Sequence, residues 1–253
     1  MNEIKRKTLL YKSEVEYADF CLNHVEGCSH GCKYPCYAFM MKKRCGIVKS
    51  YEEWCSPKIV SNALELLEKE IPKYKNAIKY VHLCFSTDPF MYKQPEIGAL
   101  SLKIISRLNR DKIKCTTLTK GIYPPVLAKE VNDNEYGITL VSLDEKFRNE
   151  YEPNTAKFKD RITSLKALHD SGSKTWVSIE PYPTPNIVNQ DLNELLKEVR
   201  FVDKIVFGRL NYSVKASEWP AHKDFYNECA GAVIKFCSKT RIGYHIKDGT
   251  LTE

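Results

Sequence analysis

Three cysteines, Cys28, Cys32 and Cys36, stand within nine residues near the start of the chain. Their even spacing would suit one face of a helix, but two glycines and a proline interrupt the same run, which favours a loop. Cubane iron–sulfur clusters are usually held by four cysteine thiolates. A compact set of three therefore predicts a cluster in which one iron stays open to a ligand that is not part of the protein.

A structural zinc ion is the first alternative to a cluster, because cysteine thiolates also bind zinc. Zinc normally takes four ligands, so a fourth donor would have to join the three cysteines. The candidates for it are His24, His30, Cys21 and Cys45. A zinc-stabilised module could then bind nucleic acid through the basic run Lys42 to Arg44 beside Tyr34 and Tyr37. An iron–sulfur electron carrier or sensor without a substrate is the second alternative.

The composition is that of a globular protein that could bury a substantial core. The chain has 253 residues, of which 43% are hydrophobic, and ten cysteines. We expect one domain over residues 1–253. No apolar stretch is long enough to span a membrane, and the basic start lacks the apolar core of a secretory leader, so we expect a cytoplasmic protein with reduced thiols. The formal charge of +7 is compatible with a polyanionic partner but does not require one.

Short β-rich runs alternate with longer amphipathic ones, which indicates repeated β-α units around a parallel sheet. Strands are predicted near 18–22, 79–86, 114–119, 136–142, 174–180 and 203–208. Helices are predicted near 57–71, 95–110, 124–132, 157–171 and 189–199. A last helix near 222–238 and a strand near 241–246 follow, within a C-terminal part of about 221–247. Six such units predict an α/β fold that forms an open barrel, whose functional groups lie at the carboxyl ends of the strands.

The segment from Asn23 through the three cysteines to Cys36-Tyr37-Ala38 resembles the cluster loop of the radical S-adenosylmethionine (SAM) superfamily, in the branch that includes spore photoproduct lyase. Three residues, Lys33-Tyr34-Pro35, separate the second and third cysteines, where the superfamily usually has two. The resemblance implies a partial (β/α)6 barrel over about residues 17–212. It also implies that the three cysteines hold a [4Fe–4S] cluster that binds SAM at its open iron.

The resemblance further implies the reaction. An electron donor such as flavodoxin or ferredoxin reduces the cluster, SAM is cleaved to a 5′-deoxyadenosyl radical, and that radical abstracts hydrogen from a substrate. Whether the substrate is a nucleic-acid base, a peptide or a small metabolite stays open. Four thiols, Cys45, Cys55, Cys229 and Cys237, are candidates for a second metal centre, but none of their pairs has the tight spacing that such centres commonly show.

Polar residues at successive strand ends match the branch in order and imply contacts to SAM. Tyr34 and Tyr37 would lie on the adenine side. Ser86 or Thr87 would face the methionine moiety. Lys120 would pair with the carboxylate in a charge-assisted contact, and Ser142 would contact the ribose.

Glu180, Arg209 and Asn211, at the ends of the fifth and sixth strands, are candidate substrate contacts. His245 and Lys247 could either cover the bottom of the barrel or reach the pocket. In this branch a cysteine shortly before the second-strand aspartate returns a hydrogen atom to the product, and that position is Phe85 here. The adjacent Cys84 is expected to point the other way, because side chains alternate across a strand.

Overall fold

A computed structural model describes residues 1–14, 16–129 and 133–252. Its main sheet has eight strands in the order β11-β10-β9-β8-β7-β6-β3-β2, parallel throughout except for β2, which runs antiparallel to β3. The strands are β2 (Leu10–Lys12), β3 (Phe20–Leu22), β6 (Tyr80–Leu83), β7 (Lys114–Thr119), β8 (Glu135–Thr139), β9 (Lys174–Tyr182), β10 (Lys204–Arg209) and β11 (Gly243–Ile246). The predicted α/β fold is confirmed, with each predicted strand present as one of these strands.

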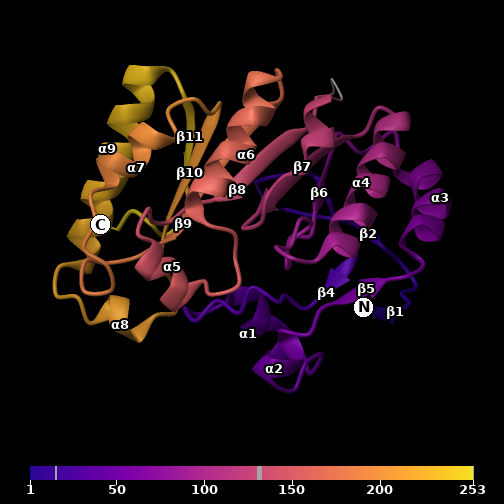
Figure 1. The fold of residues 1–253 in the computed structure, drawn as a ribbon, viewed down its shortest axis with the longest axis horizontal. Coiled ribbons are helices and arrows are strands. Elements are labelled where there is room, and N and C mark those ends of the chain that lie inside the picture. The colour runs from indigo at the N-terminus through magenta and orange to yellow at the C-terminus, as the bar shows by residue number, and fades with distance from the viewer. Residues whose placement is uncertain (15, 130–132, 253) are drawn as a thin grey trace.

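Helices flank this sheet and also gather at one of its ends. They are α1 (Tyr37–Arg44), α2 (Tyr51–Trp54), α3 (Ala63–Tyr74), α4 (Pro95–Arg110), α5 (Glu145–Tyr151), α6 (Phe158–Asp170), α7 (Leu192–Glu198), α8 (Val214–Ser217) and α9 (His222–Thr240). In Figure 1 the shorter helices α1, α2, α5 and α8 lie together below the sheet, at the carboxyl ends of its strands. This end of the sheet is where a parallel α/β barrel places its functional groups.

A second sheet of three short strands was not predicted. It consists of β1 (Asn2–Ile4), β5 (Lys58–Val60) and β4 (Val25–Glu26), with β5 in the middle. The helix predicted from residue 57 therefore begins only at Ala63, because the preceding residues pair with two strands from the start of the chain.

Two other predicted helices are shorter than the sequence pattern suggested. In the segment 124–132 the structure has a 3-10 helix over Pro125–Lys129, and residues 130–132 lie outside the described ranges. The helix predicted over 189–199 begins at Leu192, because Asp191 caps it by accepting from the Asn193 N–H.

Gly137 of β8 leaves the space that the Trp176 ring of the neighbouring strand fills. A Cβ at Gly137 would lie 2.3 Å from a ring atom of Trp176, which is 1% exposed. We therefore expect Gly137→Ala to lower the free energy of unfolding by about 1–3 kcal/mol in urea titrations. Gly231→Ala is the control: it meets no atom within 4 Å inside α9 and should raise stability by about 0.5–1 kcal/mol. Equal effects of the two substitutions would contradict the close packing of the Trp176 ring on Gly137.

Candidate functional site: a cysteine-lined cavity at the strand ends

The three cysteines stand on an ordered loop between β4 and α1, as predicted. The Cys28 N–H donates to the Trp54 carbonyl at 2.7 Å, and the Lys33 N–H donates to the Tyr151 carbonyl at 2.8 Å. Gly27 has a φ of +85°, and a Cβ there would lie 2.6 Å from the Trp54 carbonyl oxygen. A glycine is thus required for the loop to pass this close to the α2 backbone.

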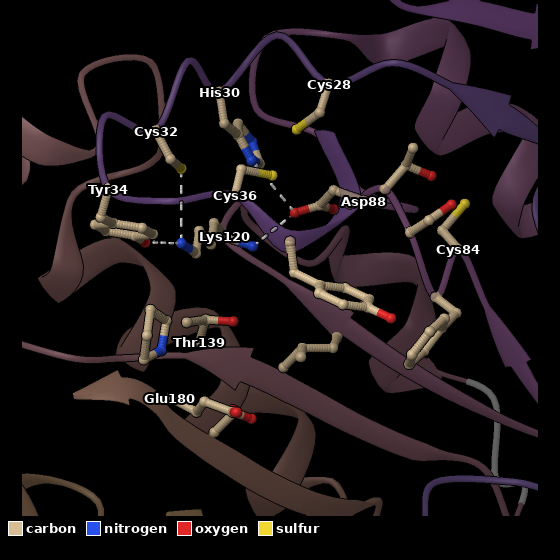
Figure 2. Close-up of a pocket in the computed structure, with 18 of the residues that line it drawn as sticks. Cys28, His30, Cys32, Tyr34, Cys36, Cys84, Asp88, Lys120, Thr139 and Glu180 are labelled. Atoms are coloured by element: carbon tan, nitrogen blue, oxygen red, sulfur yellow. Dashed lines mark hydrogen bonds and ion pairs between the residues drawn. The ribbon is translucent and has the colours of Figure 1, made fainter. Parts of the chain in front are cut away.

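All three cysteines line one cavity of about 540 Å³ at the carboxyl ends of the strands. Figure 2 shows them on one side of the cavity, with Thr139 and Glu180 on the opposite side. This arrangement separates a sulfur-rich wall from a wall of hydroxyl and charged groups.

The donor set fits a cluster better than a single ion. Among the described residues, no three His, Cys, Asp or Glu side chains come close enough together to ligate one metal ion. A cubane needs no such convergence, since each thiolate binds a different iron corner. Burial raises the pKa of Cys28 well above its usual range and that of Cys32 to about 11, so the positive charge of bound irons is what would hold these sulfurs as thiolates.

Lys120 reaches the cavity from the end of β7, beside the cysteine loop. Its Nζ lies 3.6 Å from the Cys32 Sγ, and it donates to the Tyr34 hydroxyl, whose ring it also faces at 4.5 Å. Burial works against the charge, but the nearby Cys32 and Glu152 outweigh it and raise the pKa of Lys120. Lys120 is therefore a cation fixed between the cysteine loop and the cavity.

A buried carboxylate that the sequence analysis did not assign anchors this lysine. Glu152 is fully buried, with its carboxylate oxygens 2.7 Å from the Lys120 Nζ and 2.7 Å from the Arg161 Nη2. The Tyr34 hydroxyl donates to it as well. Burial opposes ionisation of Glu152, yet the two cations keep its pKa below the usual range.

Asp88 ties three segments of the site together. It accepts from the Phe90 N–H at 2.8 Å, the Thr119 hydroxyl at 2.7 Å and the Lys120 N–H at 2.7 Å. Its other neighbour is His30 of the cysteine loop, with 3.6 Å between the His30 Nδ1 and the carboxylate. Burial lowers the pKa of His30 to about 4, so this imidazole is neutral at pH 7.

The structure brings five of the six predicted SAM contacts to the cavity. The residues that line it are Tyr34, Tyr37, Ser86, Thr87 and Lys120. Ser142 does not line it: this serine is fully buried, and its hydroxyl accepts from the Asp144 N–H at 3.0 Å. The reason is that β8 ends at Thr139, so the chain has left the strand before residue 142, and Thr139 takes the place facing the cavity.

The predicted substrate contacts Glu180, Arg209 and Asn211 all line the same cavity. Lys247 lines it too, with its Nζ 3.8 Å from the Glu180 carboxylate. The sequence left open whether His245 and Lys247 cover the bottom of the barrel or reach the pocket, and Lys247 reaches the pocket. His245 is not among the lining residues and instead lies 3.7 Å from the Glu16 carboxylate.

Cys84 follows the end of strand β6 at Leu83 and takes a φ of +60°. Both Cys84 and Phe85 are among the residues that line the cavity. The Cys84 Sγ lies 3.4 Å from the buried His24 Nδ1, and the side chain packs with Val25, Met91 and Ile97, whereas Phe85 is 39% exposed. Burial raises the pKa of Cys84 to about 12, so the side chain is a neutral thiol.

Sequence reasoning also missed His82, whose only signal was a polar residue inside an apolar strand. His82 lines the cavity, is 2% exposed and packs on Tyr17 with ring centroids 5.1 Å apart. Its Nδ1 has no hydrogen-bond partner among the described residues. Burial lowers its pKa to about 3, which leaves a neutral ring with unused hydrogen-bonding capacity.

This unused capacity predicts a gain in stability on replacement. His82→Phe should raise the free energy of unfolding by about 1 kcal/mol, because a buried polar atom without a partner costs about 1–3 kcal/mol. Thermal melting of the two proteins measures the difference. A lower melting temperature for the variant would show that the Nδ1 is satisfied in solution.

The fold and this constellation agree with the comparisons to known proteins. The family model of the radical SAM superfamily matches residues 22–199, and the chain belongs to that superfamily. Members of this class use an iron–sulfur cluster and SAM and need a reductant.

Within this class the chain is similar to spore photoproduct lyase. The structure of that enzyme complexed with a dinucleoside spore photoproduct matches with a TM-score of 0.69 and 17% identity, over 96% of this chain and 80% of the other. Streptococcus suis SuiB bound to SAM matches with a TM-score of 0.52 and 16% identity, over 71% and 42% of the two chains.

A curated relative comes from Acidianus two-tailed virus, the uncharacterized protein ORF301. It is 24% identical over an alignment of 192 residues that covers 71% of this chain. The chain spans 61% of the length of that relative. None of the helices within the described ranges has the length and apolar character needed to cross a bilayer.

Proposed function

We propose that Cys28, Cys32 and Cys36 hold a [4Fe–4S] cluster with one open iron, and that the chain cleaves SAM there to abstract hydrogen from a substrate in the same cavity. The observation that carries this proposal is the meeting of the three cysteines with Lys120 at one end of a cavity of about 540 Å³. When bound and reduced, the cluster supplies the electron that cleaves SAM to a 5′-deoxyadenosyl radical.

The protein groups bind and orient SAM in this proposal. Lys120, fixed 2.7 Å from Glu152, offers its ammonium group to the SAM carboxylate beside Cys32. Ser86 and Thr87 face the methionine moiety, and Tyr34 and Tyr37 flank the adenine side. Thr139 takes the ribose contact that the sequence analysis gave to Ser142.

The far wall of the cavity is the proposed substrate end. Ser178 presents a hydroxyl there, and Glu180 and Lys247 add one charge of each sign. Burial raises the pKa of Glu180. Such a wall suits a substrate with a polar group at one end and an unactivated C–H bond directed toward the SAM.

Anaerobic reconstitution tests the proposal directly. The chain, reconstituted with iron and sulfide, reduced with dithionite and given SAM, should form 5′-deoxyadenosine slowly even without substrate. Zinc in place of iron would support the nucleic-acid-binding alternative. A reducible cluster that never cleaves SAM would support the electron-carrier alternative, and either result would overturn the proposal.

Lys120→Ala should weaken SAM binding by at least about tenfold while leaving iron content intact, because a hydrogen bond to a charged group contributes about 1.5–3 kcal/mol. Equilibrium dialysis of the reconstituted protein measures the change. Lys33→Ala is the matched control, since Lys33 is an exposed lysine of the same loop and should not alter binding. Unchanged affinity in the Lys120 variant would remove that residue from the site.

A further inference from the structure

We propose that electrons enter through a second cleft, on the outer side of the cysteine loop, and that this cleft docks a small acidic one-electron carrier. The inference rests on the proposed function, because it requires a cluster on the cysteine loop. The cleft has a volume of about 530 Å³ and lies where α2, the start of α4 and the α5–α6 connection meet. Its lining includes Ser29, Lys93, Gln94, Arg148, Asn154 and Lys157.

A short piece of the cysteine loop separates this outer cleft from the cavity. Ser29 lines the cleft, whereas its chain neighbours Cys28 and His30 line the cavity. Ser29 of the cleft and the proposed cluster ligand Cys28 are therefore neighbours in the chain. A carrier seated in the cleft would approach the cluster without entering the barrel.

Hydrogen bonds hold the loop to the segments on either side of it, one of which carries Asn154 of the cleft lining. The Ser29 N–H donates to the Met91 Sδ at 3.2 Å, and the Asn154 N–H donates to the His30 carbonyl at 3.2 Å. Gly31 packs so closely that a Cβ there would lie 3.2 Å from the Asn154 amide nitrogen. Because these contacts already hold the cysteine loop, docking on this surface requires no rearrangement of it.

The charge of the cleft favours an acidic partner. Lys93 and Lys157 are exposed and have no ion pair among the described residues, while Arg148 is paired with Glu145 outside the lining. No carboxylate stands among the described residues that line the cleft. Unpaired lysines around a concave surface attract an acidic protein and speed its association.

The cavity itself is a poor entry route for the electron. In the proposed reaction SAM and substrate occupy it beside the three cysteines, so a protein carrier would compete with them for the same opening. The outer cleft is free of that competition. An electron can therefore be delivered while both ligands stay bound.

The test compares two reductants on the reconstituted full chain. Stopped-flow bleaching of the cluster absorbance gives the rate of reduction, first by reduced flavodoxin and then by dithionite. The charge-reversal variant K93E/K157E should lower the second-order rate constant with flavodoxin by at least about tenfold, in line with the range of electrostatic steering. The rate with dithionite should stay within about twofold.

The control variant is K235E/K239E, which reverses two exposed lysines of α9 and so changes the net charge equally. An equal slowing in both variants would mean that total charge, not the cleft, sets the rate, and would overturn the proposal. Equal slowing with dithionite would place the effect on the cluster itself, with the same consequence. A K93Q/K157Q variant should show a smaller effect in the same direction.

Binding supplies a readout that does not depend on electron transfer. Flavodoxin affinity, measured by fluorescence anisotropy at low and at physiological salt, should fall in K93E/K157E and not in K235E/K239E. If a single-stranded oligonucleotide loses affinity in K93E/K157E and flavodoxin does not, the cleft is a nucleic-acid site and the proposal fails. Absence of any reducible cluster in the unmodified chain would instead refute the proposed function.

Discussion

Cys32→Ala is expected to abolish both the bound cluster and the formation of 5′-deoxyadenosine. Cys32 lines the cavity, and its Sγ lies 3.6 Å from the Lys120 Nζ. With two thiolates left, two corners of a four-iron cluster would lack a protein ligand. Iron analysis, the visible absorption band and chromatography of the SAM reaction products measure the loss.

Cys45→Ala is the matched control for this experiment. Cys45 is an exposed free thiol at the end of α1 and does not line the cavity. We expect its replacement to change neither the iron content nor the product. Retention of the brown chromophore or of 5′-deoxyadenosine in the Cys32 variant would refute the assignment of this cysteine.

Glu152→Gln is expected to destabilise the folded chain by about 3–5 kcal/mol, the usual cost of removing one partner of a buried ion pair. The side chains of Glu152 and Arg161 are both fully buried and 2.7 Å apart, so the guanidinium would lose its charged partner without access to water. Lys120 loses the same carboxylate. Urea unfolding of the protein without its cluster measures the change.

The ion pair of Glu152 and Arg161 also makes the stability of the folded chain depend on pH in acid. The pKa of Glu152 is lowered on folding, so its contribution is fully present above the pKa of the unfolded chain and is lost as the pH falls toward the folded value. The wild-type chain should therefore lose stability below about pH 4.3, the ordinary pKa of glutamate, more steeply than the Glu152→Gln variant. Equal slopes for the two proteins would contradict the ion pair.

Glu145→Gln provides the control for burial. Its carboxylate pairs with Arg148, but the Glu145 side chain is 43% exposed. Solvent screens such a pair, so its loss should cost at most about 1 kcal/mol. A similar cost for the two glutamates would mean that burial does not determine the effect.

The sequence predicted those parts of the site that a local pattern encodes. The cysteine spacing, with its glycines and proline, is visible within one loop, and the strand ends bearing Thr87 and Lys120 follow from the alternation of β and α segments. Both lie where expected. Ser142 does not line the cavity, because β8 ends at Thr139 and not at residue 142 as the sequence predicted. The limits of a strand depend on pairing with its neighbours.

The remaining groups depend on contacts between distant segments. Glu152 meets Tyr34 across 118 residues of sequence, and no local pattern marks that pairing. The segment before α3 became a strand only because β1 and β4 pair with it. Cys84 has a left-handed backbone conformation that nothing in its residue type predicts.

Mössbauer spectroscopy of the chain reconstituted with ⁵⁷Fe, with and without SAM, tests the central claim most directly. The account predicts the signal of a four-iron cluster in which one iron site changes when SAM is added and three stay constant. Four sites that are indifferent to SAM, or a chain whose three cysteines carry zinc by X-ray absorption, would contradict it.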